Sequence, residues 1–146
     1  MALYDQLNSD LVNALRNHDE VAKNTLRGLK SALDTAVKNG ATLSDELFLT
    51  TASSEIKRRK EAIAMYESGG STERAAAEQA EIDLLMTYLP AQLSEAEIRT
   101  AVTQAVSDLG ASSMNDMGKV MGQLKGQLGA TADGATLAQI VKEVLS

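Results

Sequence analysis

The sequence predicts an all-α protein, with a bundle of long helices at the N-terminus followed by a small unit of three helices. Apolar residues recur at spacings of three and four over most of the 146 residues, which is the period of an amphipathic helix. No stretch alternates polar with β-branched residues as a half-buried strand would. Gly, Asn, Ser and Asp fall between the periodic segments, where helices usually end and begin.

Two helices are predicted within the first 40 residues. The first has leucines spaced by four (Leu3, Leu7, Leu11 and Leu15) and ends at Asn17-His18-Asp19, with Asp19 as the N-cap of the next helix. The second has a seam of coiled-coil type whose residues step by 4, 3, 4 and 3. These are Ala22, Leu26, Leu29, Leu33 and Ala36. Asn39-Gly40 is expected to end it.

The next 50 residues predict two more helices. Ser44 opens the first, and Asp45 and Glu46 lie in its positive first turn. Its predicted inward residues are Leu49, Ala52, Ile56, Ile63 and Tyr66. After Gly69-Gly70, Ser71 or Thr72 starts the other helix, whose predicted inward residues are Ala75, Gln79, Ile82, Leu85 or Met86, and Leu89. The loop between the helices near 20–38 and 45–67 is short, so we expect these two to pack as antiparallel partners.

Pro90, the single proline, forces Leu89 out of helical geometry and suggests two domains, 1–90 and 91–146. Ser94 and Glu97 form a capping box for a helix that ends at Gly110 and buries Ile98, Val102, Ala105 and Leu109. Ser113-x-x-Asp116 resembles a second box and opens a helix with Met114, Met117, Met121, Leu124 and Leu128 inward. Asp133 caps a last helix that buries Leu137, Ile140 or Val141, and Val144.

The residue types give no catalytic or metal-binding pattern. Without cysteine there is no thiolate ligand or Cys nucleophile, and the single histidine, His18, lies in a short polar break that indicates a solvated loop. Carboxylate pairs such as Glu78 and Glu81 indicate a solvated helix face. No nucleophile-elbow, Walker or dinucleotide-binding motif occurs. We therefore expect no catalytic residues, no metal and no cofactor.

Charge and hydropathy suggest a cytoplasmic protein. No apolar run approaches the roughly 20 residues of a membrane span, the N-terminus lacks the layout of a signal peptide, and the absence of cysteine suits a reducing cytosol. We expect no membrane partner. A net charge of -6 and 3% aromatic residues argue against a generic nucleic-acid binder, so DNA is not an expected partner either.

Two basic clusters are candidates for anion contact. Lys57-Arg58-Arg59-Lys60 cannot share one helix face, because consecutive residues rotate by about 100°, and we expect Arg58 and one neighbour near the seam. Alternatively, the stems pack along the bundle and the heads pair with Glu55 and Glu61 in water. The second cluster is Lys23, Arg27 and Lys30, which lie in one narrow arc beside the seam. If folding brings both clusters to one side, they form one cationic surface for an anion or RNA.

A glycine stripe is the most unusual feature of the second half. Gly118, Gly122 and Gly126 step by four within one helix, and each costs about 1 kcal/mol relative to Ala. Close packing of another helix would offset that cost. So would the close approach of a ligand backbone, with Lys119 on the rim to meet a phosphate. A third alternative is that the helix breaks near Gly126 or Gly129.

Five separated motifs in this order resemble those of the YqeY family, over essentially the whole chain. They are 3–7 (LYDQL), 55–62 (EIKRRKEA), 85–94 (LxxYLPAQLS), 116–122 (DMGKVMG) and 132–134 (ADG). The resemblance implies an all-helical fold with an N-terminal bundle and a C-terminal helical domain. It also implies kinship of the C-terminal part with the tail of GatB, the B subunit of the glutamyl/aspartyl-tRNA amidotransferase. That tail serves tRNA binding, while amide transfer occurs in other domains.

The resemblance makes a non-catalytic accessory or binding module for tRNA, or for a tRNA-handling enzyme, the leading expectation. Gly118, Lys119 and Gly122 match the family signature and are expected to contact RNA, with Lys125 on the same helix. Free-standing members carry an amidotransferase-type label. A component of a carbon–nitrogen ligase with glutamine as amide donor is therefore one alternative. A protein–protein adaptor that docks a partner helix is another.

Overall fold

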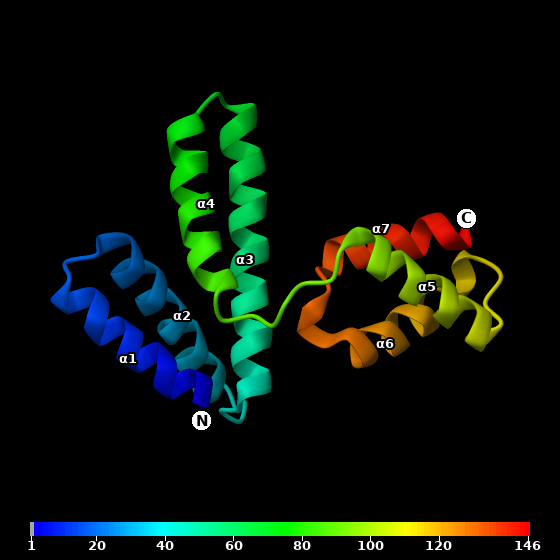
Figure 1. The fold of residues 1–146 in the computed structure, drawn as a ribbon, viewed down its shortest axis with the longest axis horizontal. Coiled ribbons are helices and arrows are strands. Elements are labelled where there is room, and N and C mark those ends of the chain that lie inside the picture. Colours follow the sequence, from blue (N-terminus) through cyan, green and yellow to red (C-terminus); the bar gives the residue numbers. More distant parts are fainter. Residues whose placement is uncertain (1) are drawn as a thin grey trace. The chain divides into compact units, whose positions relative to one another are not determined.

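The fold is all helical, as the sequence predicts. The computed structural model describes residues 2–146, and within them every regular element is an α-helix or a short 3₁₀ turn (Figure 1). The chain divides into two compact units, one ending at Leu89 and the other comprising Pro90–Ser146. In the part that the structure describes, no helix has the length and apolarity needed to cross a membrane.

Unit 1, the part up to Leu89, consists of two helical hairpins. In the first, α1 (Ala2–Arg16) packs against α2 (Glu20–Lys38), and in the second α3 (Asp45–Ser68) packs against α4 (Thr72–Met86) (Figure 1). Two predicted N-caps are confirmed. The Asp19 carboxylate accepts a hydrogen bond from the Ala22 N–H (3.1 Å), and the Ser44 hydroxyl accepts one from the Leu47 N–H (3.0 Å).

The pairing of the long helices differs from the prediction. Although α2 and α3 touch, each has its most extensive contact with a partner of its own, α1 for α2 and α4 for α3. The reason lies at Gly69-Gly70, where a tight turn folds α4 back along α3. The loop length between α2 and α3 permitted their pairing but did not determine it.

The core of unit 1 is aliphatic with two aromatic rings at its centre. Its members are Leu7, Leu26, Leu29, Leu33, Phe48, Ala52, Ile56, Ile82, Leu85 and Tyr88. Phe48, which the predicted face of α3 omitted, is fully buried, and its ring centroid lies 5.4 Å from that of Tyr88. Gln79, predicted to point inward, is exposed.

Tyr88 also connects the last residues of unit 1 to its first helix. Its hydroxyl donates a short hydrogen bond to the carboxylate of Asp10 on α1. Burial and the neighbouring Asp10 carboxylate raise the pKa of the Tyr88 phenol, so the hydroxyl keeps its proton and remains a donor.

Unit 2 contains three α-helices: α5 (Glu95–Leu109), α6 (Met117–Leu128) and α7 (Gly134–Leu145). The Ser94/Glu97 capping box is confirmed, Gly110 ends α5 with a φ of +64°, and Asp133 caps α7 by accepting from the Thr136 N–H. The buried core residues are Ile98, Val102, Ala105, Val120, Leu124, Leu137, Ile140, Val141 and Leu145.

The start of α6 differs from the prediction. Ser113 makes no side-chain cap, and Met114–Asp116 form a 3₁₀ turn. The Asp116 carboxylate instead accepts from the Ser112 N–H (3.0 Å). Because the helix begins only at Met117, Met114 is 40% exposed and Val120 occupies the buried position. The predicted break near Gly126 or Gly129 occurs at Gly129, where φ is +55°.

Candidate functional site

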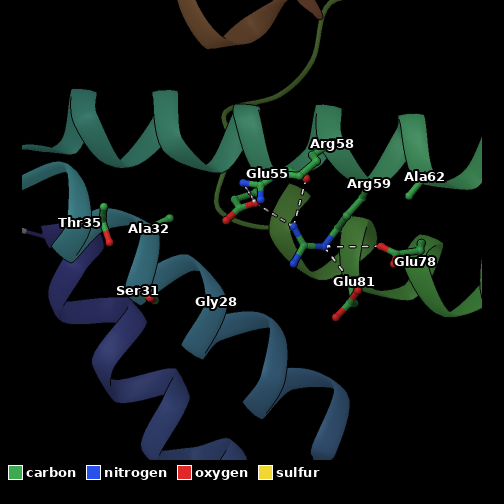
Figure 2. Close-up of a pocket in the computed structure, with 10 residues that line it drawn as sticks. All are labelled: Gly28, Ser31, Ala32, Thr35, Glu55, Arg58, Arg59, Ala62, Glu78 and Glu81. Atoms are coloured by element: carbon green, nitrogen blue, oxygen red, sulfur yellow. Dashed lines mark hydrogen bonds and ion pairs between the residues drawn. The ribbon is translucent and has the colours of Figure 1, made fainter.

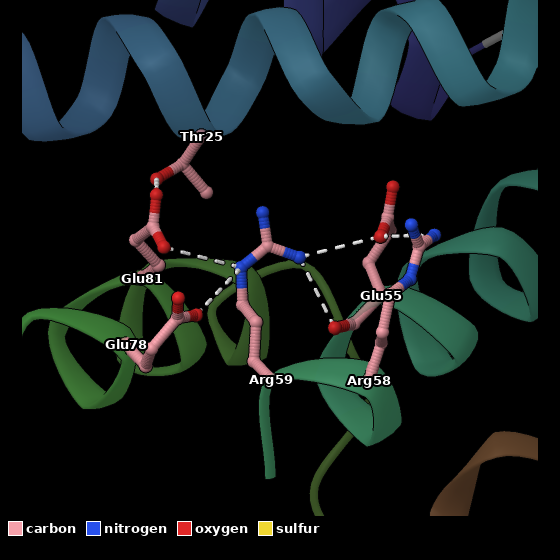
Figure 3. Close-up of polar contacts among 6 residues, drawn as sticks. All are labelled: Thr25, Glu55, Arg58, Arg59, Glu78 and Glu81. Carbon is pink, nitrogen blue, oxygen red and sulfur yellow. Dashed lines mark hydrogen bonds and ion pairs between the residues drawn. The ribbon is translucent and has the colours of Figure 1, made fainter. Parts of the chain in front are cut away.

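Arg59 is the member of the basic run that faces inward. It follows Glu55 by one helical turn, and its side chain is only 15% exposed. Its Nη1 donates to the Glu55 carbonyl oxygen (3.1 Å) and pairs with the Glu55 carboxylate (3.3 Å) (Figure 3). Arg58, which we predicted near the seam, is 73% exposed and pairs with Glu55 from the outside at 2.8 Å. The rotation of 100° per residue brings only one of the two adjacent arginines inward.

Three helices contribute to the ion cluster around Arg59. The Arg59 Nε lies 3.4 Å from Glu81 and 4.0 Å from Glu78, both on α4. On α2 the fully buried Thr25 donates its hydroxyl to Glu81 (3.2 Å). The sequence predicted Glu78 and Glu81 to be solvated, and this was wrong. The spacing of Ala75, Ile82 and Leu85 could have indicated that Glu78 faces inward, since Glu78 completes that face of α4.

Negative charge exceeds positive charge in this cluster. Three carboxylates (Glu55, Glu78 and Glu81) meet the guanidinium groups of Arg58 and Arg59. The pKa of Glu78 is raised, first by burial and then by the Glu81 carboxylate, while Arg59 opposes the shift. Glu78 is therefore the carboxylate of this cluster whose neutral form the fold favours.

Replacing Glu78 with Gln should change how stability depends on pH. With a pKa raised above 4.5 in the folded state, Glu78 makes the folded protein bind more protons than the unfolded chain at pH values just above 4.5. Stability of the wild type relative to Glu78→Gln should therefore increase as pH falls from 7 to 5. Urea unfolding at both pH values measures it, with Glu73→Gln, an exposed carboxylate of the same helix, as the control. A difference that does not change with pH contradicts the assignment.

A hollow of about 680 Å³ lies beside the cluster. One wall comes from α2 and consists of small residues: Gly28, Ser31, Ala32 and Thr35 (Figure 2). The opposite wall comes from the ion cluster together with Ala62. A Cβ on Gly28 would lie 3.9 Å from the Arg59 Nη2, so α2 approaches the guanidinium closely here.

A second, smaller hollow of about 330 Å³ adjoins the first. It is lined by Arg27, Lys30, Ser31, Asp34, Thr35 and Lys38. Both hollows are lined by Ser31 and Thr35, and we call the two together the α2 groove. The structure thus places Arg27 and Lys30 of one predicted cluster in the same groove as Arg58 and Arg59 of the other.

The other predicted basic residues of unit 1 line neither hollow. Lys23 pairs with Glu20 at 2.7 Å, and Lys57 and Lys60 are exposed on α3. Thus the two clusters meet only in part, through two residues of each.

The glycine stripe of α6 lies open on the surface of unit 2. Gly118, Gly122 and Gly126 are exposed, and no atom would lie within 4 Å of a Cβ added at any of them. Lys119 and Lys125 are exposed as well. Close packing by another helix of unit 2 therefore does not offset the cost of these glycines.

His18 is exposed in the turn between α1 and α2, with a φ of +55°. Within residues 2–146, no group of three or more His, Cys, Asp or Glu side chains is arranged to hold a metal ion.

Comparison with known proteins identifies the family. The family described as "Yqey-like protein" matches residues 4–145. One relative is "Altered inheritance of mitochondria protein 41, mitochondrial" of Pyrenophora tritici-repentis (strain Pt-1C-BFP). It is 26% identical over 147 residues, which cover 96% of this chain and 79% of that protein. Because the family match extends over almost the whole chain, this protein belongs to the YqeY-like family.

Proposed function

We propose that this protein is a non-catalytic binding module that contacts tRNA through α6 of unit 2. The observation that carries the proposal is the open glycine stripe flanked by two exposed lysines. The ligand class comes from the resemblance of the C-terminal part to the tRNA-binding tail of GatB. The match to the YqeY-like family includes α6 and supports the membership from which we infer that kinship.

The helical positions around the stripe suit a phosphate backbone. At about 100° per residue, Gly118, Gly122 and Gly126 span an arc of about 80°, and Lys125 and Lys119 lie at its two edges. Bare glycines let a ribose-phosphate chain approach the helix backbone, and lysines on both sides supply cations for its phosphates. The cost of about 1 kcal/mol per glycine is offset if a ligand uses that access.

Reversing one charge at the stripe should weaken tRNA binding. For Lys119→Glu we expect several-fold weaker retention of tRNA in filter binding. The slope of log K against the logarithm of salt concentration should be smaller in magnitude by about one. Salt should be varied from about 50 to 200 mM, the range over which phosphate contacts are screened. Lys142→Glu, an equal charge change at an exposed site on α7, should leave binding close to wild type. If micromolar wild-type protein retains no tRNA in a salt-dependent way, the proposal is wrong.

A substitution without a charge change tests access to the helix backbone. Gly122→Leu should weaken tRNA binding and leave the salt dependence unchanged, because it blocks approach and removes no cation. Gln123→Leu adds the same side chain at an exposed site outside the stripe and serves as the control. Loss of a co-purified protein with unchanged tRNA retention would instead favour an adaptor.

A further inference from the structure

We infer that the α2 groove of unit 1 is a separate phosphate-binding surface, which seats the sugar–phosphate backbone of a folded RNA. The inference rests on the proposed function for the class of ligand. All the structural observations behind it come from unit 1, and no residue of α6 is needed for it.

The groove presents positive charge outward although the protein is acidic. Arg58 is 73% exposed at its rim, whereas the side chains of Glu55, Glu78 and Glu81 are 9%, 25% and 26% exposed and are held by Arg59. The other acidic residue of the groove, Asp34, accepts a hydrogen bond from the Tyr4 hydroxyl. The three glutamates are thus engaged within the fold, and Arg58 is the exposed charge on their side of the groove. Asp34 is the one exposed carboxylate among the lining residues, and Arg27 and Lys38 are exposed beside it.

Three cations of the groove have no acidic partner in the described part of the chain. Arg27, Lys30 and Lys38 line the second hollow, and none of them makes an ion pair there. Cations left without intramolecular partners on one helix are available to an external anion.

Hydroxyl groups of the same wall add hydrogen-bond donors. Ser31 and Thr35 line both hollows, between the cations of α2 and Arg58 of α3. Phosphate oxygens accept hydrogen bonds from Arg, Lys, Ser and Thr together, which is the donor set that this groove provides. Gly28 and Ala32 have no side-chain atoms beyond Cβ, so this wall does not block the approach of a chain of phosphates.

The length and composition of the groove favour a nucleic-acid backbone over its bases. Arg27 and Lys38 are eleven residues apart on α2, about 16 Å along the helix axis. This length can accommodate a short run of consecutive phosphates of one strand. No aromatic side chain lines either hollow, so bases have no ring on which to stack. We therefore expect binding without sequence preference, to the backbone of a helical RNA segment such as a tRNA stem.

Charge reversal in the groove tests the inference. The full chain is titrated against fluorescently labelled tRNA by anisotropy, from about 50 to 200 mM salt. For Arg27→Glu combined with Lys30→Glu, we expect at least about tenfold weaker binding at the lowest salt. The slope of log K against the logarithm of salt concentration should be smaller in magnitude by about two. Lys57→Glu combined with Lys60→Glu reverses two charges on α3 that line neither hollow, and it should bind within about twofold of wild type. Circular dichroism establishes that both variants are folded.

The outcomes separate this inference from the proposed function. If Lys119→Glu weakens binding but the groove variant matches its α3 control, the groove is not a phosphate site and the inference fails alone. If the groove variant is weak but Lys119→Glu is not, the inference stands and the α6 proposal fails. Poly-glutamate serves as a competitor of equal charge. If it displaces tRNA as well as unlabelled tRNA does, the groove recognises acidic chains in general and the inference is overturned.

Discussion

Replacing Arg59 with Met should destabilise unit 1 by about 3–5 kcal/mol, the range for removing one partner of a buried ion pair. Met keeps the aliphatic bulk of the side chain but leaves Glu55, Glu78 and Glu81 without their shared cation. Of these, Glu55 is buried and would keep only the exposed Arg58 as a partner. The effect should shrink as pH falls, because Glu78, whose pKa is raised, becomes neutral and then needs no cation.

Arg58→Met is the matched control, because it is the same change one residue away. Its side chain is exposed, and we expect a loss of about 0–1 kcal/mol, as for a surface ion pair. Urea unfolding followed by circular dichroism measures both variants at pH 7. Equal losses for the two arginines would show that Arg59 does not organise the junction of α2, α3 and α4.

Replacing Phe48 with Ala should cost about 3–5 kcal/mol, because it empties the centre of the core of unit 1. Phe48 is fully buried, and its ring contacts Tyr88. Phe48→Leu fills most of the space and should cost less, since a hydrophobic replacement limits the cavity. Thermal and urea unfolding measure the free energy of unfolding of both variants.

Met65→Ala provides the surface reference for this experiment. Met65 lies on the same helix as Phe48 and is among the most exposed apolar side chains described, so its truncation should change stability by less than about 0.5 kcal/mol. A loss for Phe48→Ala that is as small as this would contradict the assigned core.

Helix boundaries could be predicted from the sequence because they depend on near neighbours. Asp19, Ser44, Ser94 and Asp133 each cap a helix by binding an N–H three residues ahead. Ser113 shows the limit of this reasoning. It has the same spacing to Asp116, but the Asp116 carboxylate binds the Ser112 N–H and a 3₁₀ turn forms instead. Two local interactions compete there, and the pattern alone does not decide between them.

The buried faces of α3 and α4 could not be fully predicted, because they depend on three helices at once. The spacing of Ala75, Ile82 and Leu85 favours Glu78 over Gln79 as an inward residue, but a carboxylate lies there only if a cation meets it. The Arg59 guanidinium selects Glu78. In the same way Arg59 is in register with Ala52, Ile56 and Ile63 on the inward face of α3, whereas Arg58 is turned away by about 100°, but this spacing does not show which groups Arg59 meets on α4. The basic run and its partner Glu55 were visible in the sequence, but Glu78 and Glu81 lie on another helix, far from Arg59 along the chain.

The glycine stripe of α6 was visible in the sequence, but its surroundings were not. Three explanations remained open for Gly118, Gly122 and Gly126: packing, ligand access and a break in the helix. Whether a neighbour covers a helix face depends on the tertiary arrangement, which spacing does not encode. The open positions around all three glycines remove packing within unit 2 as an explanation.

The hydrogen bond from Tyr88 to Asp10 has a consequence for how the protein is made. These residues are 78 positions apart, and the ring of Tyr88 lies in the same core as Leu7 of α1. On the ribosome, at roughly 5–20 residues per second, the first helix would emerge several seconds before the residue that holds its carboxylate. During that interval the leucines of α1 and α2 would have only each other and, once it had emerged, α3 to cover them, without the ring of Tyr88. A nascent chain stalled before Tyr88 would therefore expose apolar surface that chaperones bind.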